Sequence, residues 1–120
     1  MIERPHVLVV DDDDAVRLVA AEMLRSLDCD VESAADGEAA LALFENHHFD
    51  AIFLDVGMPI MNGVEVYERI RLSNASTQIF FMTGYAEEEF RDLDDPRTDV
   101  LSKPFSMLDL TTKVEMLLAD

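Results

Sequence analysis

Two runs of the sequence place carboxylates directly after apolar segments. Asp11 to Asp14 follow the apolar residues Val7–Val10, and Asp55 follows Ala51–Leu54. Carboxylates that gather at one place repel each other, and a hard divalent cation offsets that repulsion. Mg²⁺ is the cation that fits best, because it prefers oxygen ligands and keeps several waters when bound. A solvated acidic loop is the alternative, and the first run alone does not decide between the two.

A hydroxyl and an ammonium group follow two further apolar runs. Thr83 comes after residues 79–82, and Lys103 comes shortly after Val100 and Leu101. A lysine, a hydroxyl and Mg²⁺ together can hold a phosphoryl group during its transfer. A carboxylate that attacks phosphorus gives an acyl phosphate, and Asp55 is the candidate nucleophile.

The elements that must position these residues alternate along the chain. Short apolar runs, typical of strands buried on both faces, are separated by amphipathic stretches with helical spacing. The first helix presents the apolar residues Val16, Val19, Ala20, Met23, Leu24 and Leu27 on one face. The pairs Asn62 with Glu65 and Ser106 with Asp109 have the spacing of capping boxes. Strands are predicted at 7–10, 31–34, 51–54, 79–82 and 100–101, and helices at 15–27, 36–46, 64–72, 86–93 and after Ser106.

This βαβαβαβαβα order predicts one parallel sheet with helices on both faces, because right-handed crossovers must cover it. Ligands of such sheets bind outside the carboxyl ends of the strands. The topology therefore predicts one crevice that contains Asp11, Asp12, Asp55, Thr83 and Lys103.

Composition narrows the function classes. The chain has 120 residues, of which 49% are hydrophobic, and a formal net charge of −17. We expect one globular domain over residues 1–120, either a complete protein or part of a longer regulator or hybrid kinase. The negative charge disfavours direct binding of nucleic acid and of anionic membranes. No apolar run is long enough to span a bilayer, no signal peptide is visible, and Cys29 is a lone packing residue, so we expect a cytoplasmic protein.

Four segments carry a family resemblance: "VLVVDDDDAVR", "AIFLDVGMPIMNGVEV", "IFFMTGYA" and "LSKPF". They resemble the receiver domain of two-component response regulators, over nearly the whole chain. The resemblance implies an α/β fold of the (βα)5 flavodoxin-like type, with three layers and a parallel sheet of strand order 2-1-3-4-5. It also implies a signalling phosphoacceptor, which is not an enzyme in the usual sense although it assists its own phosphorylation and dephosphorylation.

The same resemblance assigns the metal ligands and the acceptor. Asp55 would accept a phosphoryl group from a histidine kinase or a histidine phosphotransfer protein. Asp12 would bind Mg²⁺ directly and Asp11 mainly through water, while Asp55 and the backbone carbonyl of Gly57 would complete the protein ligands. Asp13 and Asp14 have no implied role, and we expect them at the solvated start of a helix.

The resemblance further implies a phosphoryl-binding and switch region. Thr83 and Lys103 would each contact a phosphoryl oxygen, and the Lys103–Pro104 bond would be cis. The switch region would comprise Thr83, Gly84, Tyr85 and Val100. Because Val100 stands in the switch position, we predict that movement is concentrated in the loop from 83 to 86, which includes Tyr85. Val100 is a departure, because the family usually has Tyr or Phe three residues before the lysine, so the usual aromatic switch is in doubt.

Two more sets of residues have an expected location. Leu18 points away from the apolar face of the first helix, and receivers dock their kinase through this helix, so Leu18 is a candidate contact with the kinase. His6, His47 and His48 lack metal-like spacing with any cysteine, and we expect them to be structural or surface residues.

Three other functions remain as alternatives. A phosphohydrolase of the haloacid-dehalogenase type would use an Asp after strand one together with a Thr and a Lys, but it would leave Asp55 without a role. A flavin carrier needs a phosphate-binding loop after strand one, where four aspartates would repel phosphate. A docking module that is never phosphorylated would have no need for all five site residues.

Overall fold

The computed structural model describes residues 4–84, 90 and 93–119. From β1 to β4 and again from β5 to α5, strands and helices alternate as the sequence predicts, and these elements differ from the expected ranges only at their ends. Their bounds are β1 His6–Val10, α1 Asp14–Ser26, β2 Asp30–Ala34, α2 Gly37–Asn46, β3 Ala51–Asp55, α3 Gly63–Ser73, β4 Gln78–Thr83, β5 Thr98–Ser102 and α5 Met107–Leu118.

The helix expected over 86–93 lies mostly outside the described residues. Phe90 is helical and buried, whereas Leu93 is described and is not part of a helix.

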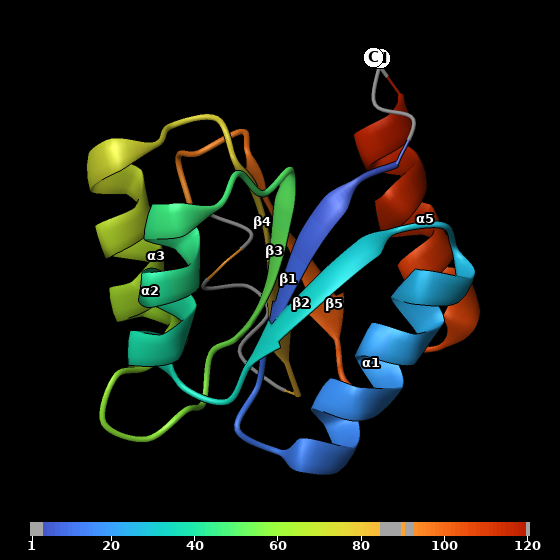
Figure 1. The fold of residues 1–120 in the computed structure, drawn as a ribbon, viewed down its shortest axis with the longest axis horizontal. Coiled ribbons are helices and arrows are strands. Elements are labelled where there is room, and N and C mark those ends of the chain that lie inside the picture. Colours follow the sequence, from blue (N-terminus) through green and yellow to red (C-terminus); the bar gives the residue numbers. More distant parts are fainter. Residues whose placement is uncertain (1–3, 85–89, 91–92, 120) are drawn as a thin grey trace.

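The five strands form one parallel sheet of order β2-β1-β3-β4-β5. Helices α2 and α3 cover one face and α1 and α5 cover the other, so the domain has three layers (Figure 1). This confirms the expected flavodoxin-like fold. The chain leaves β1 toward β2 on one side and later returns to β3 on the other, so the switch point of the sheet lies between β1 and β3. Two carboxylates lie at the ends of these strands. Asp11 directly follows β1, and Asp55 is the last residue of β3.

The three inner strands are buried on both faces. Val7–Val10 are fully buried, and β3 and β4 are buried along their whole length. Alternate residues feed two core clusters: Leu8, with others, packs on the α2 and α3 side, and Val9 packs on the α1 and α5 side. Burial on both faces explains why these strands read as continuous apolar runs. A close-packed platform of this kind fixes where the residues at its carboxyl edge lie.

The apolar face predicted for α1 is wrong at one of its ends. Ala20 and Leu24 are buried as expected, and Ala21, which was not assigned to that face, is buried as well. Val19 is 49% exposed. The reason is a groove between α1 and the segment after β5, which leaves the first turns of the helix partly uncovered.

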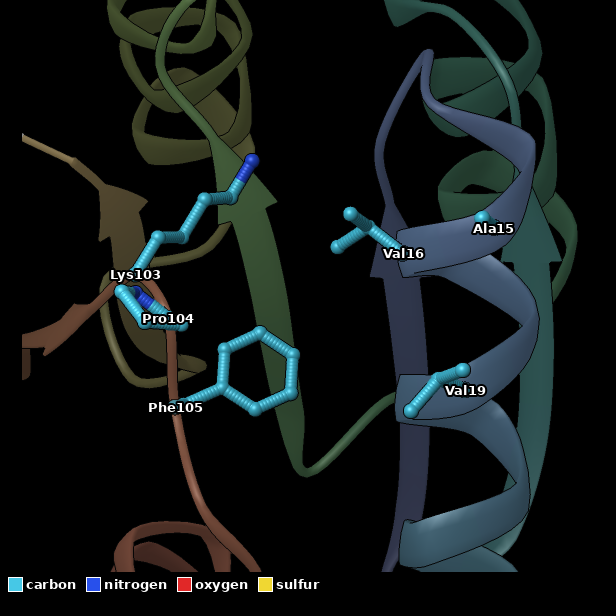
Figure 2. Close-up of a pocket in the computed structure, with 6 residues that line it drawn as sticks. All are labelled: Ala15, Val16, Val19, Lys103, Pro104 and Phe105. Carbon is cyan, nitrogen blue, oxygen red and sulfur yellow. The ribbon is translucent and has the colours of Figure 1, made fainter.

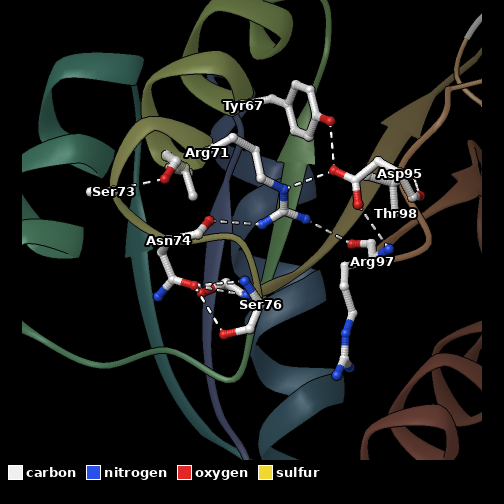
Figure 3. Close-up of polar contacts among 10 residues, drawn as sticks. Tyr67, Arg71, Ser73, Asn74, Ser76, Asp95, Arg97 and Thr98 are labelled. Atoms are coloured by element: carbon white, nitrogen blue, oxygen red, sulfur yellow. Dashed lines mark hydrogen bonds and ion pairs between the residues drawn. The ribbon is translucent and has the colours of Figure 1, made fainter.

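A network of polar contacts ties α3 to the segment before β5 (Figure 3). The Asp95 carboxylate accepts hydrogen bonds from the Tyr67 hydroxyl at 2.6 Å and from Arg71 Nε at 2.8 Å. It also accepts one from the backbone N–H of Arg97, and Arg71 Nη2 donates to the Arg97 carbonyl. Burial alone raises the pKa of Asp95, but these hydrogen bonds outweigh it and lower that pKa below its ordinary value. The network therefore anchors the start of the strand that leads to Lys103.

Candidate functional site

Three carboxylates converge at the carboxyl edge of the sheet. One oxygen each of Asp11, Asp12 and Asp55 lies within 4.8 Å of the others. Asp11 is fully buried and Asp55 is 7% exposed, whereas Asp12 is exposed at the mouth of the site. Oxygen ligands from several carboxylates at such a separation suit a hard divalent cation, so the donor set fits Mg²⁺. The three residues predicted to gather at the metal site are therefore together.

Lys103 lies between the two buried carboxylates. Its ammonium group is 2.8 Å from Asp11 Oδ2 and 3.2 Å from Asp55 Oδ1. The backbone N–H of Lys103 donates to the carbonyl of Thr83 at 2.8 Å, which extends the pairing of β4 with β5 by one step and sets the lysine at this edge. Thr83 is the last residue of β4 and is 2% exposed. The Lys103–Pro104 bond is cis, as expected.

Burial and mutual charge shift the acidity of the groups in the site. Burial raises the pKa of Asp55, and the neighbouring charge of Asp11 raises it further; the backbone N–H of Gly57 and the Lys103 ammonium oppose this only in part. Burial alone would lower the pKa of Lys103, but its hydrogen bonds and charge contacts with Asp11 and Asp55 raise it. When both carboxylates are ionised, the pair and its one ammonium retain net negative charge, which a bound cation would offset.

The four consecutive aspartates divide into two pairs. Asp11 lies in the site, where its Oδ1 accepts from the backbone N–H of Asp13, and Asp12 lies at the mouth. Asp13 is the N-cap of α1, and Asp14 in the first turn pairs with Arg17 at 2.5 Å. The expectation that the second pair forms a helix start is confirmed, and the acidic groups suit the positive end of the helix dipole.

Residues at the start and end of the loop between β3 and α3 contact Asp55. The backbone N–H of Gly57 donates to Asp55 Oδ1 at 3.3 Å. Asn62 caps α3 by accepting from the backbone N–H of Glu65 at 3.0 Å, which is one half of the expected capping box. Gly63 opens the helix so close to the strand that a Cβ atom there would lie 2.5 Å from the backbone oxygen of Asp55. No pattern in the sequence predicts this contact, although the position of Gly63 directly after the helix cap Asn62 is consistent with it.

An apolar groove of about 440 Å³ adjoins the site. Val16 and Val19 of α1 form one wall, and Pro104 and Phe105 form the other, with Lys103 at its end (Figure 2). Leu18, on the same helix, is 63% exposed, as expected from its position away from the apolar face.

A family model described as "Response regulator receiver domain" matches residues 7–115. The chain belongs to this family.

Proteins of known sequence and structure agree with the assignment to the receiver family. The sensor kinase CckA of Brucella abortus is 37% identical over 116 residues, which are 93% of this chain and 12% of the kinase. The response regulator MprA of Mycobacterium sp. (strain KMS) is 38% identical over 115 residues, which are 94% of this chain and 50% of that protein. The chain therefore spans half or less of the length of these relatives.

A solved structure shares the fold of this receiver domain. The response regulator TrrA of Thermotoga maritima, crystallised in complex with Mg²⁺-BeF, superimposes with a TM-score of 0.83 at 31% identity. The match covers 94% of this chain and 98% of that one.

The expected switch region of the receiver is described only in part. Val100 is 4% exposed and pairs with Phe81 in the sheet, so the position usually held by an aromatic residue is filled by a core aliphatic one. Gly84 is exposed, and Tyr85 lies outside the described residues. No helix in the described part of this receiver is both long and apolar enough to cross a bilayer.

Proposed function

We propose that Asp55 of this receiver accepts a phosphoryl group from the phosphohistidine of a histidine kinase or a histidine phosphotransfer protein, with Mg²⁺ as cofactor. The observation that carries the proposal is the position of Lys103, whose ammonium contacts both Asp11 and Asp55 beside the exposed carboxylate of Asp12. This arrangement offers a nucleophile, a metal-binding donor set and a fixed positive charge in one place.

The cofactor assignment follows from the donor set. Asp11, Asp12 and Asp55, with the carbonyl of Gly57, would hold Mg²⁺, which supplies positive charge to the phosphoryl oxygens when it is bound. The Mg²⁺-BeF complex of TrrA, a relative with the same fold, supports this assignment.

The chemical step uses residues at three strand ends. A carboxylate oxygen of Asp55 attacks phosphorus, the P–N bond of the donor breaks, and the electron pair of that bond stays on the ring, which leaves as neutral imidazole with its proton on the other nitrogen. The product is an acyl phosphate on Asp55. The Lys103 ammonium is close enough to Asp55 to pair with a phosphoryl oxygen, and the hydroxyl of Thr83 would contact another.

The donor must bring its histidine to the mouth of the site, so its docking surface must border Asp55. The groove beside α1 meets this condition, since Lys103 lies at its end and its walls are apolar. We assign it, with Leu18, to an apolar helix of the histidine-bearing partner. The net charge of −17 favours a partner with basic residues around that helix. We place this exchange in the cytoplasm, which agrees with a free thiol at Cys29.

Phosphorylation would replace the single negative charge of the Asp55 carboxylate with about two on the acyl phosphate, which would draw Lys103 and Thr83 inward. The buried Val100 has no ring to reorient, so we expect the movement in the loop that begins at Thr83 and Gly84, with Tyr85. This is a shift between two populated states of one fold. A crystal structure of the beryllofluoride form in which that loop has not moved would contradict this part of the proposal.

Intact-mass measurement after incubation with Mg²⁺ and a small acyl-phosphate donor tests the function. One added phosphoryl group, absent in Asp55→Asn and absent when Mg²⁺ is chelated, is the expected result. A gain that persists in Asp55→Asn and disappears in Asp11→Asn would favour the haloacid-dehalogenase type of hydrolase. No gain with either the small donor or a cognate kinase, in a folded protein that binds Mg²⁺, would favour a docking module.

A further inference from the structure

The loop between β3 and α3 has both of its ends on the proposed acceptor. The backbone N–H of Gly57 donates to Asp55 Oδ1 at 3.3 Å, and Gly63 packs against the backbone carbonyl of Asp55. Ile60 lies halfway between these two glycines. A fully extended chain spans at most about 11 Å over that separation, so the Ile60 Cα atom lies within roughly 15 Å of the Asp55 carbonyl oxygen. The tip of the loop is therefore close to the acceptor.

The backbone at Ile60 is strained. Its φ is 68°, and the N–H of Met61 donates to the carbonyl of Pro59 at 2.7 Å, which closes a tight turn around it. A positive φ together with a bond between residues i and i+2 describes the rarer form of γ-turn, which is strained. A β-branched side chain adds to the cost of a positive φ, whereas Gly and Asn tolerate it. Backbone preference therefore does not explain an isoleucine at this position.

Packing does not explain this isoleucine either. Ile60 is 99% exposed, so its side chain buries almost no area in the fold. Its neighbours anchor the turn instead: Met58 is buried, and Met61 packs against the core cluster on the α2 and α3 side of the sheet. The turn is thus held in place and directs one apolar side chain into solvent. Backbone strain of this kind persists where the surrounding structure enforces it, and it is concentrated at sites that bind or switch.

Exposure alone would not distinguish Ile60 from other surface residues. Isolated apolar side chains are common on protein surfaces, and Leu72 on α3 is 88% exposed in helical backbone. Ile60 differs because its exposure coincides with an unfavourable backbone and with proximity to Asp55. The loop is also neutral, since residues 56–64 contain no charged side chain in a chain whose net charge is −17. Such a surface is complementary to an apolar patch on a partner.

A partner that delivers a histidine to Asp55 must cover this loop. A stable protein interface covers about 800 Å² of each partner, which corresponds to a disc of roughly 16 Å radius. A disc of that size centred on Asp55 includes Ile60. Figure 1 shows this loop and the start of α1 at the same edge of the sheet, on opposite sides of the strand ends. The partner can therefore contact apolar side chains on both sides of the acceptor.

We propose that Ile60 is an apolar docking contact for the histidine-bearing partner, and that it inserts between apolar side chains on that partner's surface. The inference rests on the function proposed above, because it needs a partner that carries a phosphohistidine. It assigns to that partner a second contact, on the side of the acceptor opposite to Leu18. The constrained turn fixes the direction of the Ile60 side chain before binding, so less conformational freedom is lost when the two proteins meet.

The test compares phosphotransfer with stability. Phosphorylated histidine kinases and phosphotransfer proteins of the source organism are first screened against wild type, and the fastest of them is the protein donor used. Ile60→Asn removes the apolar side chain and tolerates a positive φ, so we expect a Tm above that of wild type. We also expect transfer from the protein donor to be roughly tenfold slower, with a much smaller change in the reaction with a small acyl phosphate.

Two further variants serve as controls for the loss of transfer. Ile60→Leu keeps an apolar side chain of the same size, and it should keep most of the transfer rate. Leu72→Asn makes the same change as Ile60→Asn at an exposed leucine on α3, and it should leave both reactions at the wild-type rate.

Transfer from the protein donor that is unchanged in Ile60→Asn would overturn the proposal. An equal loss in the acyl-phosphate reaction would also overturn it, because the side chain would then act through Asp55 and not through the partner. A lower Tm in Ile60→Asn would show that the isoleucine stabilises the fold, which removes the argument from strain. A wild-type protein that reacts with neither donor would contradict the proposed function itself, so the two failures are distinguishable.

Discussion

Gly63 packs directly against the backbone carbonyl of Asp55. A Cβ atom at position 63 would lie 2.5 Å from that oxygen and 2.8 Å from Val56 Cα, and both are backbone atoms that a side-chain rotation cannot move. The first turn of α3 thus supports the strand end that carries the proposed acceptor, so the position of the Asp55 carboxylate depends on a residue with no side chain.

Gly63→Ala should destabilise the domain by about 1–3 kcal/mol, because the added methyl group forces the backbone of β3 and α3 apart. It should also slow phosphorylation of Asp55, since the acceptor is displaced. Gly84→Ala is the matched control: a Cβ atom there meets no atom of the described residues within 4 Å, so its stability should stay within about 0.5 kcal/mol of wild type. Urea unfolding of both variants checks the first effect. Equal stabilities would contradict the packing argument.

The raised pKa of Asp55 should determine how the stability of the metal-free domain changes with pH. Its folded pKa is raised by burial and by Asp11, so the folded state holds the proton more tightly than the unfolded state. Without metal, stability should therefore fall as pH rises from the ordinary aspartate value, about 3.9, through the raised value. Asp55→Asn should be more stable than wild type at neutral pH in EDTA and lose that advantage in acid.

Thermal unfolding across pH, with and without Mg²⁺, measures this effect. Mg²⁺ should reverse the order at neutral pH, because it stabilises wild type and has fewer ligands in the variant. An Asp55→Asn protein that is less stable than wild type at neutral pH in EDTA would show that the pairing with Lys103 outweighs the cost of burial.

Substitutions of Asp11 and of Asp12 should have different effects on stability and on Mg²⁺ binding. Asp12 is exposed, so Asp12→Asn should leave stability in EDTA within about 0.5 kcal/mol of wild type while weakening Mg²⁺ binding at least roughly tenfold. Asp11 is fully buried and pairs with Lys103 at 2.8 Å, so Asp11→Asn should alter both properties. Mg²⁺-dependent thermal shifts of the two variants make the comparison, and an Asp12→Asn protein with normal Mg²⁺ affinity would remove Asp12 from the ligand set.

Asp95 should make the domain sensitive to acid. Its pKa is lowered by hydrogen bonds from Tyr67 and Arg71, against the opposing effect of burial, so the stability it contributes is present above about pH 3.9 and is lost as pH falls through the folded value. Asp95→Asn should cost about 1–3 kcal/mol at neutral pH and flatten the acid limb of the stability curve. The exposed neighbour Asp94 provides the control, and an Asp94→Asn variant with the same loss would exclude a specific role for the network.

Leu18→Glu should slow phosphotransfer from the cognate kinase while leaving phosphorylation by a small donor unchanged, because the small donor needs no docking surface. Leu72→Glu makes the same change at an 88% exposed leucine on α3, away from the groove, and should have no effect on either reaction. The rates of phosphotransfer from the kinase to the two variants and to wild type test this prediction. Normal transfer to Leu18→Glu would remove this residue from the interface.

The sequence predicts the fold and the main site because both depend on local patterns. Apolar runs identify the strands, and the residues at their ends, Asp11, Asp55, Thr83 and Lys103, fall at one edge once the strands are parallel. Topology alone brings them near each other, without knowledge of any single contact.

Local sequence patterns do not predict contacts between side chains that are far apart in the sequence. Lys103 is 92 residues from Asp11, and no periodicity indicates that its ammonium lies between two buried carboxylates. The anchoring of Asp95 by Tyr67 and Arg71 joins residues 24 to 28 positions apart. The exposure of Val19 depends on how closely α5 and its preceding segment approach α1, which helical periodicity does not contain.

The strand order leaves β2 and β5 as the two edges of the sheet, and both carry acidic side chains. Asp30 and Glu32 lie on β2, and Asp99 lies on β5. Charged residues on an edge strand oppose the addition of a further strand, and two copies of a domain with a net charge of −17 repel each other before their edges meet. The sheet is therefore protected against growth by strand addition, which is the first step toward cross-β aggregation.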